Sequence, residues 1–415
     1  MLKKLDRNTL SFLIGAIAFY AIVQILLSLG VLSEFWETIL RLGGVMAIVA
    51  LGLNLIYGFN GQFSLGQWGF YAIGAYTAAD ITYRWTNDGS TSGLTVLLLL
   101  VLLVGAACVF LYRGLNRIRG LDALSGFTIY ILAAILLSLL SVWIGRGVAP
   151  ILDGVLKILP SWLADNIVYL LAVLIGGVLA AEVSFLFGMP VLTLGSDYFG
   201  IATLGLTIIV YVLLQNSDTL LGFVEMKGAR GMIGIPKITS WFWVMFFLIL
   251  VVILTRNLLQ SSYGRAIISV REDEIAAKAM GIDVGFYKTL TFVLGSLYAG
   301  LAGGLYAHVN GFLHPDTFNF VRSFDPLIIV VLGGLGSVTG TIFASFAWAL
   351  VLEGVLRLVL PSGFETWRYV VYPMLLLVMM LLKPNGLFGN FEIPFLRDFI
   401  PPLRKKLESI REAVK

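Results

Sequence analysis

Apolar blocks alternate with short polar segments along almost the whole chain. The blocks are roughly 18 to 24 residues long, which allows a helix to cross about 30 Å of hydrocarbon at 1.5 Å per residue. In lipid they must be helices, because only a helix satisfies its backbone polar groups without a neighbour. We predict helices near residues 10–32, 39–58, 67–83, 93–112, 125–146, 166–187, 197–216, 240–259, 287–309, 325–338, 339–360 and 368–383.

Two glycine-rich interruptions modify this pattern. The block at 325–338 is too short to cross alone and contains Gly333-Gly334-Leu335-Gly336, which favours a broken or half-span helix. A second run, Gly58–Gly66, lies between two blocks at membrane depth. We therefore predict an all-α fold, a polytopic transmembrane helix bundle of about 10–12 spans with broken or re-entrant Gly-rich segments.

Composition narrows the class of protein. Of the 415 residues, 59% are hydrophobic and 13% are charged, and the mean hydropathy is +0.94. A soluble domain carries about 25% charged residues, so a water-soluble enzyme, a nucleic-acid binder and a disordered chain are disfavoured. With one cysteine, Cys108, two histidines and no GxxxxGK(S/T) loop, we expect no catalytic residue, metal site or bound nucleotide.

Basic residues predict the orientation, because cytoplasmic loops carry an excess of Lys and Arg. Alternating crossings place both termini in the cytoplasm, in a multi-pass protein of the cytoplasmic (inner) membrane. The loop at 260–286 then lies inside and the loop at 217–239 outside, where Lys227, Arg230 and Lys237 are a mild exception. The inside clusters are Lys3, Lys4, Arg7, Arg113, Arg117, Arg119, Arg256, Arg265, Arg271, Lys278, Lys288, Lys383, Arg404, Lys405 and Lys406.

The inside loop at 260–286 contains a helix signal of its own. Ser269 and Glu272 fit a capping box, with Ser269 as the N-cap. An acidic first turn and an apolar stripe follow, and Gly281 can end the helix. We predict a short amphipathic helix over 269–281, either a solvated connector or a helix that fits a groove on a cytoplasmic partner. The acidic turn is Glu272, Asp273 and Glu274, and the stripe is Ile275, Ala276, Ala279 and Met280.

The same loop is similar to a known docking motif. Glu274–Gly281, EIAAKAMG, resembles the "EAA…G" loop by which ABC importer permeases dock onto their ATPase subunits. Five segments, in order along the chain, resemble the branched-chain amino acid ABC transporter permease family of the LivM type. They are Leu51–Ala78, Leu194–Gly205, Ser261–Ala307, Val330–Gly340 and Leu381–Gly389.

This resemblance implies a division of labour. The chain would be the permease subunit of an ABC importer for branched-chain or related hydrophobic amino acids, while two cytoplasmic ATPase subunits would hold ATP and Mg. A second homologous permease chain would complete the pore in the lipid bilayer, an external, periplasmic binding protein would deliver the cargo, and nucleic acid would have no part. The ATPase-coupling loop would comprise Ser269, Arg271, Glu272, Asp273, Glu274, Ala276, Ala277 and Gly281.

The resemblance also implies domain boundaries. Residues 1–390 would form the transmembrane permease domain, and 391–415 would form a cytoplasmic basic tail. The stretch between Ala78 and Leu194 is longer than the family pattern, so we predict a two-span insertion within 80–165. Two added spans leave the sidedness of the downstream loops unchanged.

Polar and small residues at the two interruptions are candidates for the translocation path. Unwound backbone at membrane depth must face protein or a water-filled cavity, where it can bind the charged ends of a substrate. Tight helix packing by small residues is the alternative. The candidates are Asn54, Asn60, Gly61, Gln62, Ser64, Gly66, Gln67, Gly333, Gly334 and Gly336.

Other functions remain open. The same machine with another cargo, such as urea or a short amide, is the first. An ion-coupled secondary transporter is the second, and it predicts in-span carboxylates at an ion site and uptake without an ATPase. The lone ionisable residues Asp80, Glu182 and His308 lie near predicted span ends, where we attribute them to snorkelling towards the interface.

Overall fold

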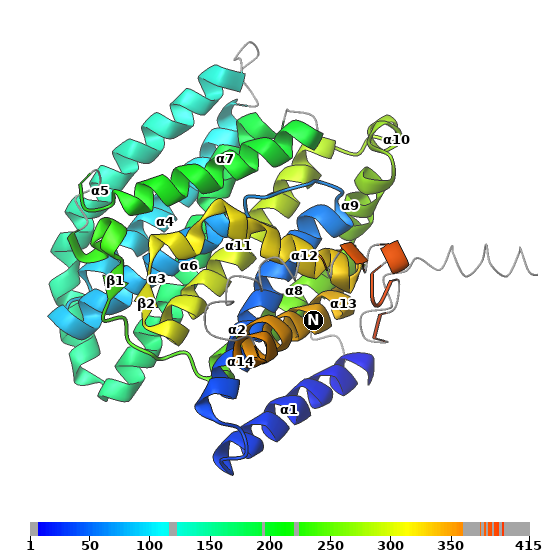
Figure 1. Cartoon of the computed structure of the whole chain (residues 1–415). Helices are drawn as coiled ribbons and strands as arrows, with labels where there is room; N and C mark the ends of the chain where they lie inside the picture. The colour runs from blue at the N-terminus through cyan, green and yellow to red at the C-terminus, as the bar shows by residue number, and fades with distance from the viewer. Residues whose placement is uncertain are drawn as a thin grey trace, which may run out of the picture.

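The protein is a bundle of apolar α-helices, as the computed structural model shows (Figure 1). The structure describes residues 7–115, 123–192, 196–219, 224–359, 374, 377–378, 381–383, 386–389 and 392–393. Within these residues, seven helices are long and apolar enough to cross a membrane, and Ile14–Ser28 and Ser92–Ala107 are shorter apolar helices. The predicted all-α, polytopic fold is confirmed.

Most predicted blocks correspond to helices, although the block at 368–383 and the tail at 391–415 lie largely outside the described residues. The elements are α1 (Arg7–Ser28), α2 (Glu34–Leu53), the π-helix η1 (Asn54–Phe59), α3 (Gln67–Asp88), α4 (Ser92–Leu115), α5 (Ala123–Ile158), α6 (Ser161–Val191), α7 (Ser196–Gln215), the 3₁₀ turns η2 (Val224–Met226) and η3 (Gly228–Arg230), β1 (Met232–Ile233), α8 (Trp241–Gln260), α9 (Ser262–Glu272), α10 (Glu274–Ala279), α11 (Val284–Asn310), β2 (Phe312–Leu313), the 3₁₀ turns η4 (Pro315–Phe318) and η5 (Phe320–Ser323), α12 (Phe324–Gly333), α13 (Val338–Trp348), the π-helix η6 (Ala349–Val355) and α14 (Leu356–Val359).

Helix α11 forms the centre of the bundle and packs against α2, α3 and α6. The contacts run through glycines: a Cβ on Gly74 of α3 would lie 2.0 Å from the carbonyl oxygen of Gly300. A Cβ on Gly303 would lie 2.0 Å from the carbonyl oxygen of Tyr71. A Cβ on Gly176 of α6 would lie 2.8 Å from the carbonyl oxygen of Gly74. Small residues let membrane helices approach this closely, so the three backbones are in direct contact.

The block at 325–338 is broken, as the sequence predicts. Helix α12 ends at Gly333 after ten residues. Gly334 and Gly336 follow with φ angles of +116° and +81°, a region that favours glycine. Ser337 then begins α13, and its Oγ accepts a hydrogen bond from the Gly340 nitrogen at 2.9 Å. The two half-length helices therefore fold back on each other around a glycine turn.

Helices α4 and α5 pack against each other at one edge of the bundle, on the left of Figure 1. Polar contacts join them: the Thr91 nitrogen donates to Asp153 Oδ1 at 2.6 Å, and Thr95 Oγ1 donates to the Gly145 carbonyl at 3.0 Å. This pair lies within the predicted insertion at 80–165, which stays a prediction.

The bundle has two ends, which helix α11 separates. Helix α10 comes just before α11, and strand β2 comes just after it. At the second end β2 pairs antiparallel with β1, with Met232 opposite Leu313. We call these the docking end, which holds α9 and α10, and the ladder end, which holds β1 and β2.

Candidate functional site

The site begins where α2 passes into the π-helix η1. Asn54, the first residue of η1, is fully buried. Its Nδ2 donates to the Ser337 carbonyl oxygen and to Thr341 Oγ1, both at 2.9 Å. Its Oδ1 accepts from the Gly336 nitrogen at 2.9 Å. Asn54 therefore ties the first glycine-rich interruption to the second, across more than half of the chain.

Gly58 allows this close contact. A Cβ at position 58 would lie 1.8 Å from Asn54 Oδ1 and 2.6 Å from the Gly336 nitrogen. Real atoms do not approach this closely, so any side chain would push η1 away from the α12–α13 turn. Gly333 serves the same purpose within that turn, since its Cβ would lie 2.5 Å from the Gly340 carbonyl.

Arg271 of α9 contacts both interruptions. Its Nη1 donates to the Gly58 carbonyl oxygen at 2.6 Å. A Cβ on Gly61, whose φ is +76°, would lie 3.3 Å from Arg271 Cγ, and a Cβ on Gly336 would lie 2.9 Å from Arg271 Nη1. One side chain thus connects the predicted coupling loop with the end of η1 and with the α12–α13 turn.

The predicted capping box at Ser269 is wrong. Ser269 lies inside α9, and its Oγ donates to the Ala266 carbonyl at 2.7 Å. Helix α9 begins earlier, with Ser261 as its N-cap. It buries Ile267 and Val270 against the bundle, and this packing keeps the chain helical through Ser269.

Asp273 is the residue that begins the second helix. It has an extended backbone, with φ −158° and ψ 108°, which separates α9 from α10. Its Oδ1 accepts hydrogen bonds from the nitrogens of Ile275 and Ala276, both at 2.9 Å. Two short helices therefore replace the single helix that we predict over 269–281. Asp273, which we predict as a charge in the first helical turn, is instead the N-cap of α10.

Helix α10 presents apolar side chains to its surroundings. Ile275 and Met280 are each 83% exposed, whereas Ala277 is buried. Gly281, with φ +82°, ends the helix, because its nitrogen bonds to the Lys278 carbonyl and the Ile282 nitrogen bonds to the Ala277 carbonyl. An exposed Ile–Met pair on a short, well-capped helix is suited to a groove on a partner.

A cavity of about 190 Å³ lies between the docking loop and the first interruption. The loop after η1 forms one wall, and the α9–α10 junction forms another. Lys288 of α11 bonds to Glu274 at 2.6 Å at its edge. The lining residues are Asn60, Gly61, Gln62, Leu192, Phe199, Val270, Arg271, Glu272, Asp273, Glu274 and Lys288.

The remaining path candidates divide into two groups. Ser64 and Gly66 lie against α7, where Thr203 Oγ1 accepts from the Leu65 nitrogen at 3.1 Å and Thr207 Oγ1 donates to the Leu65 carbonyl at 3.2 Å. Gln67 is buried, and neither side-chain amide atom has a hydrogen-bond partner among the residues that the structure describes. Ser64 and Gly66 are thus held in a hydroxyl-capped turn, while Gln67 retains unused hydrogen-bonding capacity in the interior.

Glu392 is a residue of this region that the sequence does not indicate. Its Oε1 accepts from the Val338 nitrogen at 2.6 Å, and its Oε2 accepts from the Thr339 nitrogen at 3.2 Å and from Thr339 Oγ1 at 2.5 Å. Burial raises the pKa of Glu392, and these hydrogen bonds partly oppose the rise. Glu392 therefore caps the N-terminus of α13 beside the glycine turn.

The lone ionisable residues are buried in protein, so the snorkelling interpretation is wrong. His308 is fully buried, with Nε2 2.7 Å from Thr82 Oγ1 and Nδ1 2.7 Å from the Gly304 carbonyl. Glu182 is 8% exposed and lies against Gly105 of α4. Their helices face neighbouring helices at these positions, which a one-dimensional hydropathy pattern does not reveal.

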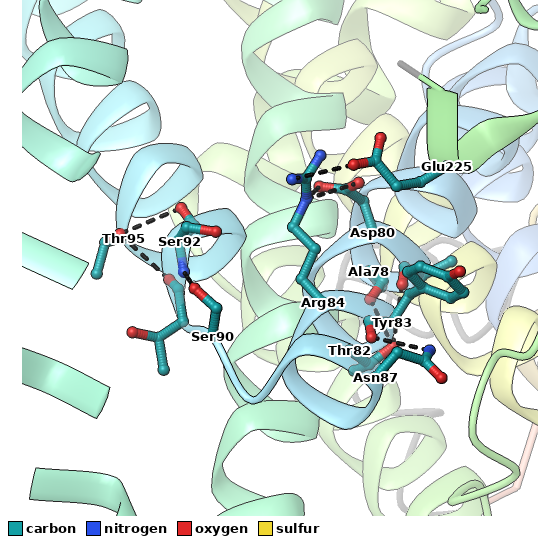
Figure 2. Close-up of polar contacts among 12 residues, drawn as sticks. Ala78, Asp80, Thr82, Tyr83, Arg84, Asn87, Ser90, Ser92, Thr95 and Glu225 are labelled. Atoms are coloured by element: carbon teal, nitrogen blue, oxygen red, sulfur yellow. Dashed lines mark hydrogen bonds and ion pairs between the residues drawn. The ribbon is translucent and has the colours of Figure 1, made fainter. Parts of the chain in front are cut away.

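Asp80 belongs to an ionic cluster at the ladder end (Figure 2). Arg84 Nε donates to both Asp80 carboxylate oxygens at 3.1 Å, and Arg84 Nη1 lies 3.4 Å from Glu225 Oε1. Glu225 belongs to η2 in the loop at 217–239, so the cluster fastens that loop to α3. The loop is anchored on the bundle at this point.

The apolar helices define an integral membrane protein, with a buried polar junction near one end. The chain belongs to the family described as the branched-chain amino acid transport system permease component, whose model matches residues 35–151 and 123–380. Members of this family are transport permease subunits. No solved structure matches the chain.

Named relatives of the chain are permeases as well. It is 28% identical over 404 residues to the high-affinity branched-chain amino acid transport system permease protein LivM of Escherichia coli (strain K12), covering 87% of this chain and 74% of the relative. It is 24% identical over 370 residues to the permease protein BraD of Pseudomonas aeruginosa, covering 85% and 94%. A probable LivM of Methanocaldococcus jannaschii is 27% identical over 263 residues, covering 59% and 73%.

Proposed function

We propose that this chain is the permease subunit of an ABC importer that carries branched-chain or related hydrophobic amino acids across the cytoplasmic membrane. The observation that carries the proposal is the family match along most of the chain, which includes the exposed helix α10. The names of the relatives supply the class of cargo. The docking end faces the cytoplasm in this proposal, since most Lys and Arg clusters then lie on the inside.

Partner subunits supply the energy and the cargo. Two ATPase subunits hold ATP and Mg and receive the exposed face of α10, with Ile275 and Met280 as its apolar contacts. A second, homologous permease chain completes the pore. A binding protein delivers the cargo at the ladder end, where the Arg84–Glu225 ion pair holds the loop at 217–239 in place.

The geometry of Arg271 suggests how the motion is transmitted. When the ATPases close on ATP, they displace α10 and α9 together. Each helix has a buried residue packed in the bundle, Val270 in α9 and Ala277 in α10, which couples its position to the other helices. Arg271 then pulls on the Gly58 carbonyl and, through Asn54, on the α12–α13 turn. Both interruptions move as one unit. Alternating access needs two packings that differ by a few kcal/mol, and this junction is where the ATPases bias them.

The decisive experiment is reconstituted uptake. The full-length chain is co-expressed with its partner permease, ATPases and binding protein, and the complex is placed in proteoliposomes. We expect labelled leucine to accumulate only with ATP and binding protein, and not when the ATPases carry a catalytic substitution. Leucine uptake driven by an ion gradient without nucleotide would overturn the proposal, and uptake of urea in preference to leucine would overturn the assigned cargo.

A further inference from the structure

Charged residues of both signs line the cavity at the docking end: two cations, Arg271 and Lys288, and three carboxylates, Glu272, Asp273 and Glu274. Arg271 Nη1 donates one hydrogen bond to the Gly58 carbonyl oxygen. Among the described residues, no carboxylate lies within ion-pair distance of its guanidinium, whereas the other cation of the cavity, Lys288, is paired with Glu274. A guanidinium has five N–H donors in a planar fork that matches a carboxylate. Arg271 therefore has unused donors beside the cavity.

Two residues of the lining carry buried acceptors. Asn60 Nδ2 donates to Thr291 Oγ1 at 2.8 Å, and within the described residues Asn60 Oδ1 has no hydrogen-bond partner. In the same part of the chain, Gln62 Oε1 is also buried without a partner. Asn60 is 2% exposed and Gln62 is 6% exposed. A buried acceptor without a donor lowers stability, so these oxygens favour a ligand that carries a donor such as an ammonium group.

The third wall is apolar. Leu192, Phe199 and Val270 line the cavity, and Phe199 and Val270 are buried in the bundle. The cavity volume of about 190 Å³ corresponds to roughly six water molecules at about 30 Å³ each. That space suits a small molecule with one aliphatic arm.

We propose that this cavity binds a zwitterionic amino acid with an apolar side chain. Arg271 receives the carboxylate, the oxygens of Asn60 and Gln62 receive the ammonium group, and Leu192, Phe199 and Val270 surround the aliphatic arm. The cargo class rests on the proposed function, but the location is new. The ligand bridges α9 to the loop after η1, so it holds the docking loop in place, and amino acid on this side slows further import.

The binding test uses thiol protection. In a Cys108→Ser background, Glu272→Cys places a thiol on the lining of the cavity. Leucine should slow modification of this thiol at least tenfold in the full-length chain in nanodiscs without nucleotide. Glycine, 4-methylpentanoate and 3-methylbutylamine each lack one of the three recognised groups and should protect only at concentrations at least tenfold higher. Arg265→Cys, on the exposed face of α9 outside the cavity, should show no protection.

Two variants assign the walls. Arg271→Gln should weaken protection by leucine at least tenfold and leave protection by 3-methylbutylamine unchanged, because the amine has no carboxylate. Gln62→Leu removes an unpartnered acceptor, so it should weaken protection by leucine while keeping or raising the melting temperature. Undiminished protection in both variants, equal protection by glycine, or no protection of Glu272→Cys would overturn the site.

The two proposals fail differently. Preloading proteoliposomes with leucine should lower ATP-driven uptake, and Gln62→Leu should relieve this inhibition. If uptake proceeds but preloading has no effect and the thiol is unprotected, the cavity is no amino-acid site and the transport function stands. If leucine is neither transported nor bound, the assigned cargo is wrong.

Discussion

At the residue scale, Asn54 has the most far-reaching contacts in the described part of the chain. A single buried amide satisfies a carbonyl oxygen, a hydroxyl and a backbone nitrogen of a segment 282 positions away. Nothing in the local sequence around Asn54 names these partners. The sequence shows a polar residue beside a glycine-rich interruption. The hydrogen-bond partners of Asn54, however, depend on how α12 and α13 fold back on each other, which is a property of the tertiary structure.

Removal of the Asn54 side chain should therefore be costly. Asn54→Ala leaves the Gly336 nitrogen and the Ser337 carbonyl without this buried partner, so we expect a loss of about 2 kcal/mol or more in stability and a clear fall in melting temperature. The matched control is Asn216→Ala, whose side chain bonds to the Val212 carbonyl at an exposed position. Equal melting temperatures for the two variants would contradict the role of Asn54.

Arg271 supports a second prediction at this scale. Arg271→Gln removes the charge-assisted bond to the Gly58 carbonyl and should lower the leucine transported per ATP hydrolysed, with ATPase capture retained. Arg265→Gln is the control, since in the described part of the chain Arg265 bonds to Gln260 and Ser262, close to it in sequence. The measurement is uptake and hydrolysis in the same proteoliposomes. A proportional loss of both would indicate a docking defect instead of an uncoupled junction.

At the scale of elements, α9 and α10 illustrate what a sequence pattern can and cannot give. The exposed apolar stripe, the acidic start and Gly281 at the end are all readable, since each is a local property. The N-cap is not, because Ser269 and Asp273 are both good caps and the choice depends on the packing of Ile267 and Val270. The prediction of a half-length helix at 325–338 is confirmed, because the glycines that end α12 and form the turn are a local property of the sequence.

The two candidate caps can be separated by mutation. Asp273→Ala should destabilise α10 by about 1 kcal/mol, through loss of two hydrogen bonds at its N-terminus, and weaken ATPase capture about fivefold. Ser269→Ala should change capture by less than twofold, because its hydroxyl bonds to the Ala266 carbonyl within α9 and does not cap α10. Capture of the ATPases on a tagged chain measures both. The reverse ranking would restore the capping box at Ser269.

At the scale of the whole molecule, hydropathy accounts for most of the architecture. The apolar blocks locate the helices, because their length and composition respond directly to the bilayer. Hydropathy fails for Asp80, Glu182 and His308, whose burial depends on which face of a helix meets another helix. The sequence does not reveal the cavity at the docking end either, since its lining residues come from six separate helices or loops and meet only in the folded bundle.

The orientation of the bundle can be tested directly. Helix α11 has 27 residues and spans about 40 Å, so it separates the docking end from the ladder end by a membrane thickness. In a Cys108→Ser background, Lys278→Cys should react with an impermeant maleimide only in inside-out vesicles. Arg230→Cys, in η3 at the ladder end, should react only in right-side-out vesicles. Reaction of both from one side would refute the proposed crossings.

The glycine contacts at the centre of the bundle limit how this protein can move. Helices α3, α6 and α11 touch backbone to backbone, and discrete rearrangements of such packing are expensive. They should travel as one rigid block during a transport cycle. Flexing then falls to the places where the helical winding is already loosened, η1 and η6, both of which are π-helical. The two π-helical segments lie on either side of α13 and the glycine turn, so we expect the α12–α13 hairpin to shift relative to the glycine-packed block during transport.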